Sequence, residues 1–157
     1  RQNVAASPWP DVVRLIKGDI LTYQPDKGYS LIVSNPPFFR HRLAANDVLR
    51  HQARHSDSLP FEALLDCAGR FLLPGGRFEL ILPSAEAAVF GTLAEQQGWY
   101  AARRCAVHTT PAKAASRLLM SWQREPAGCI HSQLIIQDKQ GYTSEYKQLL
   151  REFYLAF

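Results

Sequence analysis

A short apolar run that two prolines bring to an end constrains the fold of this chain more than any other feature. Residues Tyr29 to Ser34 (YSLIVS) have the length and the β-branched content of a buried strand. Pro36 and Pro37 stop that strand, because proline fixes its own backbone and has no amide hydrogen to donate. Asn35 is therefore presented at the carboxyl end of a strand, which is where open α/β sheets bind their ligands.

Strand and helix patterns alternate through most of the chain. Strands are expected over residues 12–17, 29–34, 77–82, 99–107, 117–123 and 131–137. Helices are expected over residues 1–7, 59–72 and 84–97, and a last helix after the turn at residues 139–141. Alternation in the first part predicts a parallel sheet with helices on its faces, and consecutive strands near the end predict an antiparallel addition. The sequence contains no internal repeat and no linker, so one structural unit is expected.

Two of these helices have clear boundary signals. Apolar residues recur at helical spacing after Pro60, and Pro74-Gly75-Gly76 is expected to stop that helix. Ser84 is expected to cap the start of the next helix, with Gly98 at its end. The last helix is expected to bury one face, formed by Tyr146, Leu149, Leu150, Phe153 and Phe157.

Composition indicates a globular chain. Of its 157 residues, 46% are apolar and 20% are charged, and no apolar run approaches the roughly 20 residues of a membrane span. Cys67, Cys105 and Cys129 show neither metal-ligand nor disulfide spacing, so we expect no metal and a reducing, cytoplasmic environment. The sequence has no signal peptide pattern at its start.

Positive charge is concentrated in two stretches. The formal net charge is +4, and no Asp or Glu occurs from Gln96 to Arg124, a stretch with five basic residues. Residues 40–55 carry four arginines and three histidines against one acid, Asp47. Residues 39–58 are also long for a structureless loop, which favours a functional role. Both stretches are compatible with an ordinary solvated surface and with a track for nucleic-acid phosphates.

The motif Asn35-Pro36-Pro37-Phe38 suits a planar amine. The Asn35 amide oxygen and a nearby carbonyl can accept hydrogen bonds from the amine, and the Phe38 ring can stack on a flat base. The motif resembles the Asn/Asp-Pro-Pro-aromatic signature of class I S-adenosylmethionine-dependent amino-methyltransferases. That resemblance implies methylation of adenine N6, guanine N2, cytosine N4 or a glutamine side-chain amide.

A wider set of fragments narrows the resemblance. Ser7-Pro8-Trp9, Gly18-Asp19, the segment 34–39, Gln52-Ala53-Arg54-His55 and the segments 142–146 and 153–155 occur in this order along the chain. Together they resemble the bacterial tRNA methyltransferases that modify adenine N6 beside the anticodon of a valine tRNA. The resemblance implies S-adenosylmethionine as cofactor and tRNA as partner.

The resemblance also implies a fold. Class I methyltransferases are Rossmann-like α/β three-layer sandwiches with a mostly parallel sheet and an antiparallel strand near the carboxyl terminus. They begin with a glycine-rich loop and an acidic residue for the ribose, and this chain shows neither, since Gly75-Gly76 lies in a helix-to-strand turn. We therefore expect residues 1–157 to be the carboxyl-terminal two thirds of a single methyltransferase domain, without its amino-terminal part.

Residue roles follow from the same resemblance. Asn35, Pro36, Pro37 and Phe38 would form the catalytic motif, with Asn35 and the Pro36 carbonyl on the target amine. Asp19 would accept a hydrogen bond from the cofactor's adenine amine, and Asn35 would also contact the cofactor. For Asp19 the alternative is a purely structural role in the turn after Gly18. Arg54 and His55 would contact RNA phosphate or clamp the loop, with a loop salt bridge or a solvated pair as an equal alternative. From the basic stretch, Arg40 and Arg42 are also expected to contact RNA, with a solvated basic face as the alternative.

Other functions remain open at this point. A protein-glutamine methyltransferase uses the same tetrapeptide on a similar amide, and a DNA or ribosomal-RNA amino-methyltransferase is a closer alternative. A non-enzymatic RNA-binding protein on the same fold is a third. The sequence predicts no oligomeric state.

Overall fold

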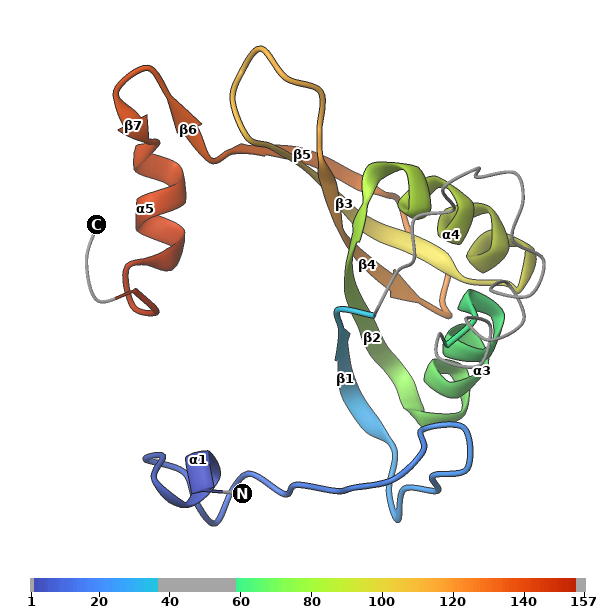
Figure 1. The fold of residues 1–157 in the computed structure, drawn as a ribbon. Helices are drawn as coiled ribbons and strands as arrows, with labels where there is room; N and C mark the ends of the chain where they lie inside the picture. The colour runs from blue at the N-terminus through green and yellow to red at the C-terminus, as the bar shows by residue number, and fades with distance from the viewer. Residues whose placement is uncertain (1, 37–58, 155–157) are drawn as a thin grey trace, which may run out of the picture.

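The computed structural model describes residues 2–36 and 59–154. Within them, five strands form one sheet in the order β1-β2-β4-β3-β5, and β6 and β7 form a separate hairpin (Figure 1). The strands are β1 (Tyr29–Ser34), β2 (Leu72–Pro83), β3 (Tyr100–His108), β4 (Arg117–Gln123), β5 (Ile130–Ile135), β6 (Gln137–Asp138) and β7 (Gly141–Tyr142). The helices are α1 (Gln2–Ala5), α3 (Phe61–Phe71), α4 (Ser84–Gln96) and α5 (Ser144–Leu150).

Strand directions match the predicted mixed sheet. Strand β1 is parallel to β2, and β3 is parallel to β5, while β4 is antiparallel to both β2 and β3. Four strands of the five-stranded sheet therefore end at one edge, which we call the carboxyl edge, and β4 starts there at Arg117. The prediction of a mostly parallel sheet with one antiparallel strand near the carboxyl terminus is confirmed.

Helices α3 and α4 cover one face of the sheet, and α5 lies on the opposite side, beyond β5 (Figure 1). Pro60 precedes α3 in an extended conformation, which fits the tolerance of helix starts for proline. The buried residues of α3 recur at helical spacing as the sequence predicted, with Leu64, Leu65, Ala68 and Phe71 against the sheet.

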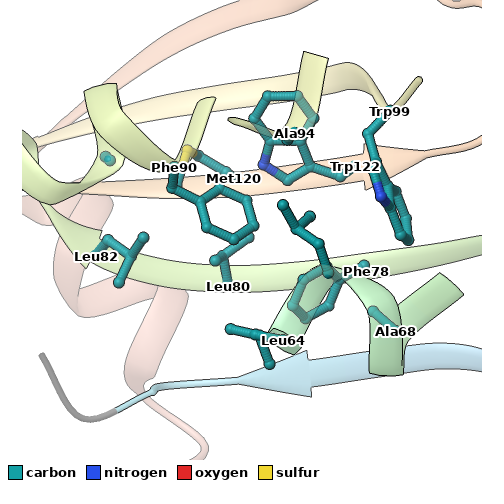
Figure 2. Close-up of a cluster of buried hydrophobic side chains, with 12 residues drawn as sticks. Leu64, Ala68, Phe78, Leu80, Leu82, Phe90, Ala94, Trp99, Met120 and Trp122 are labelled. Carbon is teal, nitrogen blue, oxygen red and sulfur yellow. The ribbon is translucent and has the colours of Figure 1, made fainter. Parts of the chain in front are cut away.

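An aromatic cluster forms the core between these helices and the sheet. Phe90 of α4 packs edge-on against Phe78 of β2 and Trp122 of β4, with ring centroids 6.3 and 5.8 Å away. Trp99 closes the cluster next to Phe78 (Figure 2). All four side chains are almost completely buried, so this cluster fixes how α4 sits on the two central strands.

The opposite face of the sheet is largely uncovered in the described part of the chain; we call it the open face. The strand pairing puts Val33 beside Glu79, and Leu119 beside Ile81, on the side away from the core. Val33 is 72% exposed, Leu31 54% and Leu119 37%. Such an apolar sheet surface is normally packed against another layer, which the described residues supply only near β5 and α5.

The predicted strand at residues 12–17 is wrong. These residues form no strand in the structure, and Val12, Val13, Leu15 and Ile16 are all exposed. A strand is stable only when it is both paired and packed, and the described residues provide no layer over this segment. Strand β1 is consequently the edge strand of the sheet within residues 2–36 and 59–154.

Two predicted boundary signals act differently from what was expected. Helix α3 ends at Phe71, and Pro74-Gly75-Gly76 belongs to an irregular start of β2, where Tyr29 pairs with Leu72 but Leu31 pairs with Arg77. Ser84 is not the cap of α4, because Pro83 holds that position and makes no side-chain capping bond. Gly98, with a φ of 75°, does follow the end of α4 as predicted.

Helix α5 is shorter and more exposed than its sequence pattern indicated. It ends at Leu150 with no buried residue, and Phe153 is 81% exposed, while Phe157 lies outside the described residues. Thr143 caps the helix through its hydroxyl, and Tyr142 stacks on Tyr146 at 5.4 Å. Partial burial, with smaller effects from Tyr154 and Tyr142, raises the pKa of Tyr146.

The aromatic cluster yields a stability prediction. Replacing Phe90 by Ala should lower the free energy of unfolding by about 3–5 kcal/mol, because it leaves a cavity between α4 and the sheet. Val89 is the adjacent residue of the same helix and is 57% exposed, so Val89→Ala should cost less than about 1 kcal/mol. Urea unfolding of both variants provides the measurement, and similar losses for the two would contradict this packing.

Candidate functional site at the carboxyl edge of the sheet

Asn35 lies at the carboxyl edge, directly after the last residue of β1. Its side chain is exposed, whereas Pro36 is buried behind it. Ser34 pairs with Leu80, so Asn35 lies beside the last residues of β2. Asn35 follows Val33 by two residues, and strand alternation continued by one residue puts both side chains toward the open face. A rigid proline thus holds an amide at the place the sequence predicted.

Asp19 lies elsewhere. Its carboxylate accepts a hydrogen bond from the Leu21 amide at 2.9 Å, and its carbonyl accepts one from Tyr23 at 3.0 Å, so it forms a compact turn. The next residues contact the end of α3, where Arg70 donates to the Leu21 carbonyl and Cys67 to the Ile20 carbonyl.

That contact places the Asp19 turn near the amino end of β1. The last residue of α3 is followed by Leu72, which pairs with Tyr29, the first residue of β1. The six residues of β1, about 17 Å of strand, separate this region from Asn35. The structure therefore does not bring Asp19 and Asn35 together, because the segment before Asp19 forms no strand that would carry it to the carboxyl edge. Its cofactor role stays a prediction.

Several predicted site residues lie outside the described residues. They are Pro37 and Phe38 of the motif and the four residues predicted to contact RNA, Arg40, Arg42, Arg54 and His55. Their roles stay predictions as well.

The basic residues between Gln96 and Arg124 lie in different environments and differ in their contacts. Arg104 forms an ion pair with Glu95 at 2.8 Å and lies over the Trp122 ring. Arg124 donates to the Gln97 carbonyl at 2.7 Å and lies 4.4 Å over the Trp99 ring. These two arginines cover the aromatic core with their charged ends, which is a structural role.

Two other basic residues of the stretch, Lys113 and Arg117, lie at the carboxyl edge. Lys113 is in the loop between β3 and β4, and Arg117 is the first residue of β4, paired with Pro83 at the end of β2. Both are exposed. The sequence showed the charges but not their separation from Arg104 and Arg124; the short segment TTPAKAAS between two strand patterns was the available signal for a loop at this edge.

No complete cofactor pocket is formed by the described residues. Two grooves among the described residues lie between α5 and β5, and between α3 and Leu21, and neither is lined by Asn35 or Asp19. Asn35 fits the accepting side of a methyl-transfer site, but the residues that would bind the cofactor's carboxylate and ribose are not found among residues 2–36 and 59–154. The fit to S-adenosylmethionine is therefore partial.

Two features are absent from the described residues. These residues contain no group of three or more His, Cys, Asp or Glu side chains arranged to hold a metal ion. None of the described helices is long and apolar enough to cross a membrane.

The curated proteins that this chain resembles carry names that agree with the resemblance of the Asn35 motif to amino-methyltransferases. The chain is 41% identical over 155 residues to a curated protein from Tolumonas auensis, and 38% identical over 156 residues to one from Bacteroides thetaiotaomicron. Both carry the name tRNA1(Val) (adenine(37)-N6)-methyltransferase. The matches cover 98% and 99% of this chain but 65% and 66% of those proteins. The chain thus spans just under two thirds of the length of the curated relatives that it matches.

A solved structure supports the fold. A predicted O-methyltransferase from Agrobacterium tumefaciens superposes on 86% of this chain with a TM-score of 0.61 at 17% sequence identity, and 61% of that chain is covered. At this identity the likeness concerns the fold alone. No family model matches the sequence.

The class I methyltransferase fold predicted from the sequence is therefore confirmed. The predicted resemblance is confirmed too: over nearly its whole length, the chain is similar at 36–41% identity to proteins named tRNA1(Val) (adenine(37)-N6)-methyltransferase.

Proposed function

We propose that this chain takes part in S-adenosylmethionine-dependent methylation of an adenine N6 amine in tRNA, in the cytoplasm. The observation that supports this most is the exposed Asn35 amide at the carboxyl edge of the sheet, in a chain 36–41% identical to curated relatives named for that reaction. The exposed basic residues Lys113 and Arg117 at the same edge favour a nucleic-acid substrate over a protein glutamine.

The proposed chemistry uses the motif as a set of acceptors. An aromatic amine is a weak nucleophile because its lone pair is delocalised into the ring. The Asn35 side-chain oxygen and the Pro36 carbonyl would accept the two amine hydrogens, which draws the nitrogen toward tetrahedral geometry. Phe38 would stack on the adenine and fix its plane. S-adenosylmethionine, when bound, supplies a methyl group on a positively charged sulfur.

Alignment is the main contribution expected from this chain. Two fixed acceptors and a stacking ring hold the amine in one orientation, and the acceptors complement the positive charge that develops on the nitrogen. No strong general base is required, since the nitrogen becomes acidic as it is methylated. The target adenine must also leave its stack, which is cheapest in an unpaired loop.

We further propose that residues 1–157 correspond to the carboxyl-terminal two thirds of one methyltransferase domain. Three observations support this: the open face with exposed Leu31 and Val33, the exposed apolar segment at residues 12–16, and relatives about half as long again. In this arrangement a further layer would cover the open face and bring Asp19 toward the cofactor.

The role of Asn35 can be tested in a hybrid that joins residues 1–157 to the amino-terminal third of the Tolumonas auensis relative. Asn35→Ala should lower the single-turnover rate of methyl transfer by about a hundredfold, because an acceptor used in the transition state is lost. Cofactor affinity should change little, and Asn35→Asp should restore part of the rate. Asn3→Ala is the matched control in an exposed position of α1. A rate within threefold of the unmodified hybrid would remove this role from Asn35.

The domain proposal predicts weak cofactor binding by residues 1–157 alone. Titration calorimetry with S-adenosylmethionine should show no binding at micromolar cofactor, because the groups for its carboxylate and ribose are missing. The hybrid should bind under the same conditions. Micromolar affinity of residues 1–157 by themselves would contradict the proposed place of this chain in the domain.

A further inference from the structure

The loop between β3 and β4, residues 109–116, is a rigid projection from the carboxyl edge. Its base is closed by hydrogen bonds from the Ser116 amide to the Val107 carbonyl at 2.8 Å and from the His108 ring to the Lys113 carbonyl at 2.9 Å. Since a carbonyl only accepts, Nδ1 of His108 carries the proton in this contact. The loop extends from the ends of β3 and β4 beyond the edge of the sheet (Figure 1).

Contacts from both neighbouring strands hold this loop in place. Ser84, after β2, donates its hydroxyl to the Ala115 carbonyl at 2.6 Å and its amide to the Ser116 carbonyl at 3.2 Å. On the other side, the amides of Ile136 and Gln137 donate to the carbonyls of His108 and Thr109. The loop is thereby pre-organised, which lowers the entropy cost of binding a partner.

Charge on this projection is positive. Residues 109–116 contain Lys113 and no acid, and Arg117 follows as the first residue of β4. Both side chains are exposed. Two acids follow residues that contact the loop: Glu86 lies two residues after Ser84, and Asp138 lies directly after Gln137. Both disfavour a phosphate at the base of the loop. The favourable positions for a phosphate are therefore the loop tip at Lys113 and the start of β4 at Arg117.

The strand order relates these positions to Asn35. Strand β4 is two strands from β1 in the sheet, a lateral separation of about 10 Å. Arg117 pairs with Pro83, and Ser34 pairs with Leu80, so Arg117 projects a few residues beyond Asn35 at the same edge. If one base of a single-stranded RNA segment lay at Asn35, the phosphates of the adjacent nucleotides would lie near this loop.

We propose that Lys113 and Arg117 form a phosphate-binding border for a single-stranded RNA loop whose target base is at Asn35. That the base at Asn35 is an adenine rests on the proposed function, whereas the binding of RNA phosphates by Lys113 and Arg117 does not. It assigns to the loop between β3 and β4 the positioning of the substrate. Arg104 and Arg124 take no part, since they are occupied on Trp122 and Trp99.

The experiment measures binding of a fluorescent tRNA anticodon stem-loop to residues 1–157 by anisotropy at several salt concentrations. Lys113→Ala and Arg117→Ala should each weaken binding and reduce the slope of log affinity against log salt by about 0.7, the value for one phosphate on a single strand. The double variant should lose about twice as much slope. Lys113→Arg should retain binding, because the charge is kept.

Lys27→Ala is the matched control. Lys27 is an exposed lysine shortly before β1, at the opposite edge of the sheet, and its loss should leave the slope unchanged. Circular dichroism of each variant confirms that the fold is kept. Slopes for the Lys113 and Arg117 variants equal to that of Lys27→Ala would overturn the inference, as would an absence of RNA binding by the unmodified chain. RNA binding that depends on these residues, with no methyl transfer by the hybrid, would instead contradict the proposed function alone.

Discussion

The pairing of β4 between β2 and β3 determines where the functional groups of this protein lie. Because β4 runs against its neighbours, the chain must turn back at the carboxyl edge after β3, and the turn is the loop that carries Lys113. The same pairing brings Trp122 of β4 under Phe90 of α4, so the strand that creates the loop is also fixed by the core. Asn35 and the basic loop therefore share an edge as a consequence of sheet topology.

Local patterns predicted much of the fold. Tyr29 to Ser34 is a strand with the predicted bounds, because a short run that contains Leu31, Ile32 and Val33 favours a strand and the two prolines after it prevent its continuation. Residues 117–123 form β4 as predicted, and the apolar spacing from Phe61 gives α3. In α3 and β4 the local preference and the burial of the tertiary structure agree, which is the condition for a pattern to be reliable. Strand β1 forms as predicted but is not the buried strand that its composition indicated, since Leu31 and Val33 are exposed on the open face.

Other features depend on contacts that a pattern does not contain. Residues 12–17 have a strand pattern but no partner among the described residues, so they are exposed instead. Ser84 has the chemistry of a cap, yet its hydroxyl is used on the Ala115 carbonyl, which is distant in the sequence. The basic run looked uniform, whereas two of its members lie over the rings of buried tryptophans and two others lie at the carboxyl edge. The fifth, Arg103, is an exposed residue within β3.

The site is thus partly assembled. The side proposed to hold the target amine follows β1, and the proposed basic border lies at the start of β4 and in the loop before it, while the groups for the cofactor are incomplete among the described residues. The most direct test is mass spectrometry of the nucleosides in tRNA from a bacterial strain lacking this protein, after incubation of that tRNA with the hybrid and S-adenosylmethionine. The account predicts new N6-methyladenosine in tRNA. A methyl group on another base, or on a protein glutamine offered in the same reaction, would contradict it.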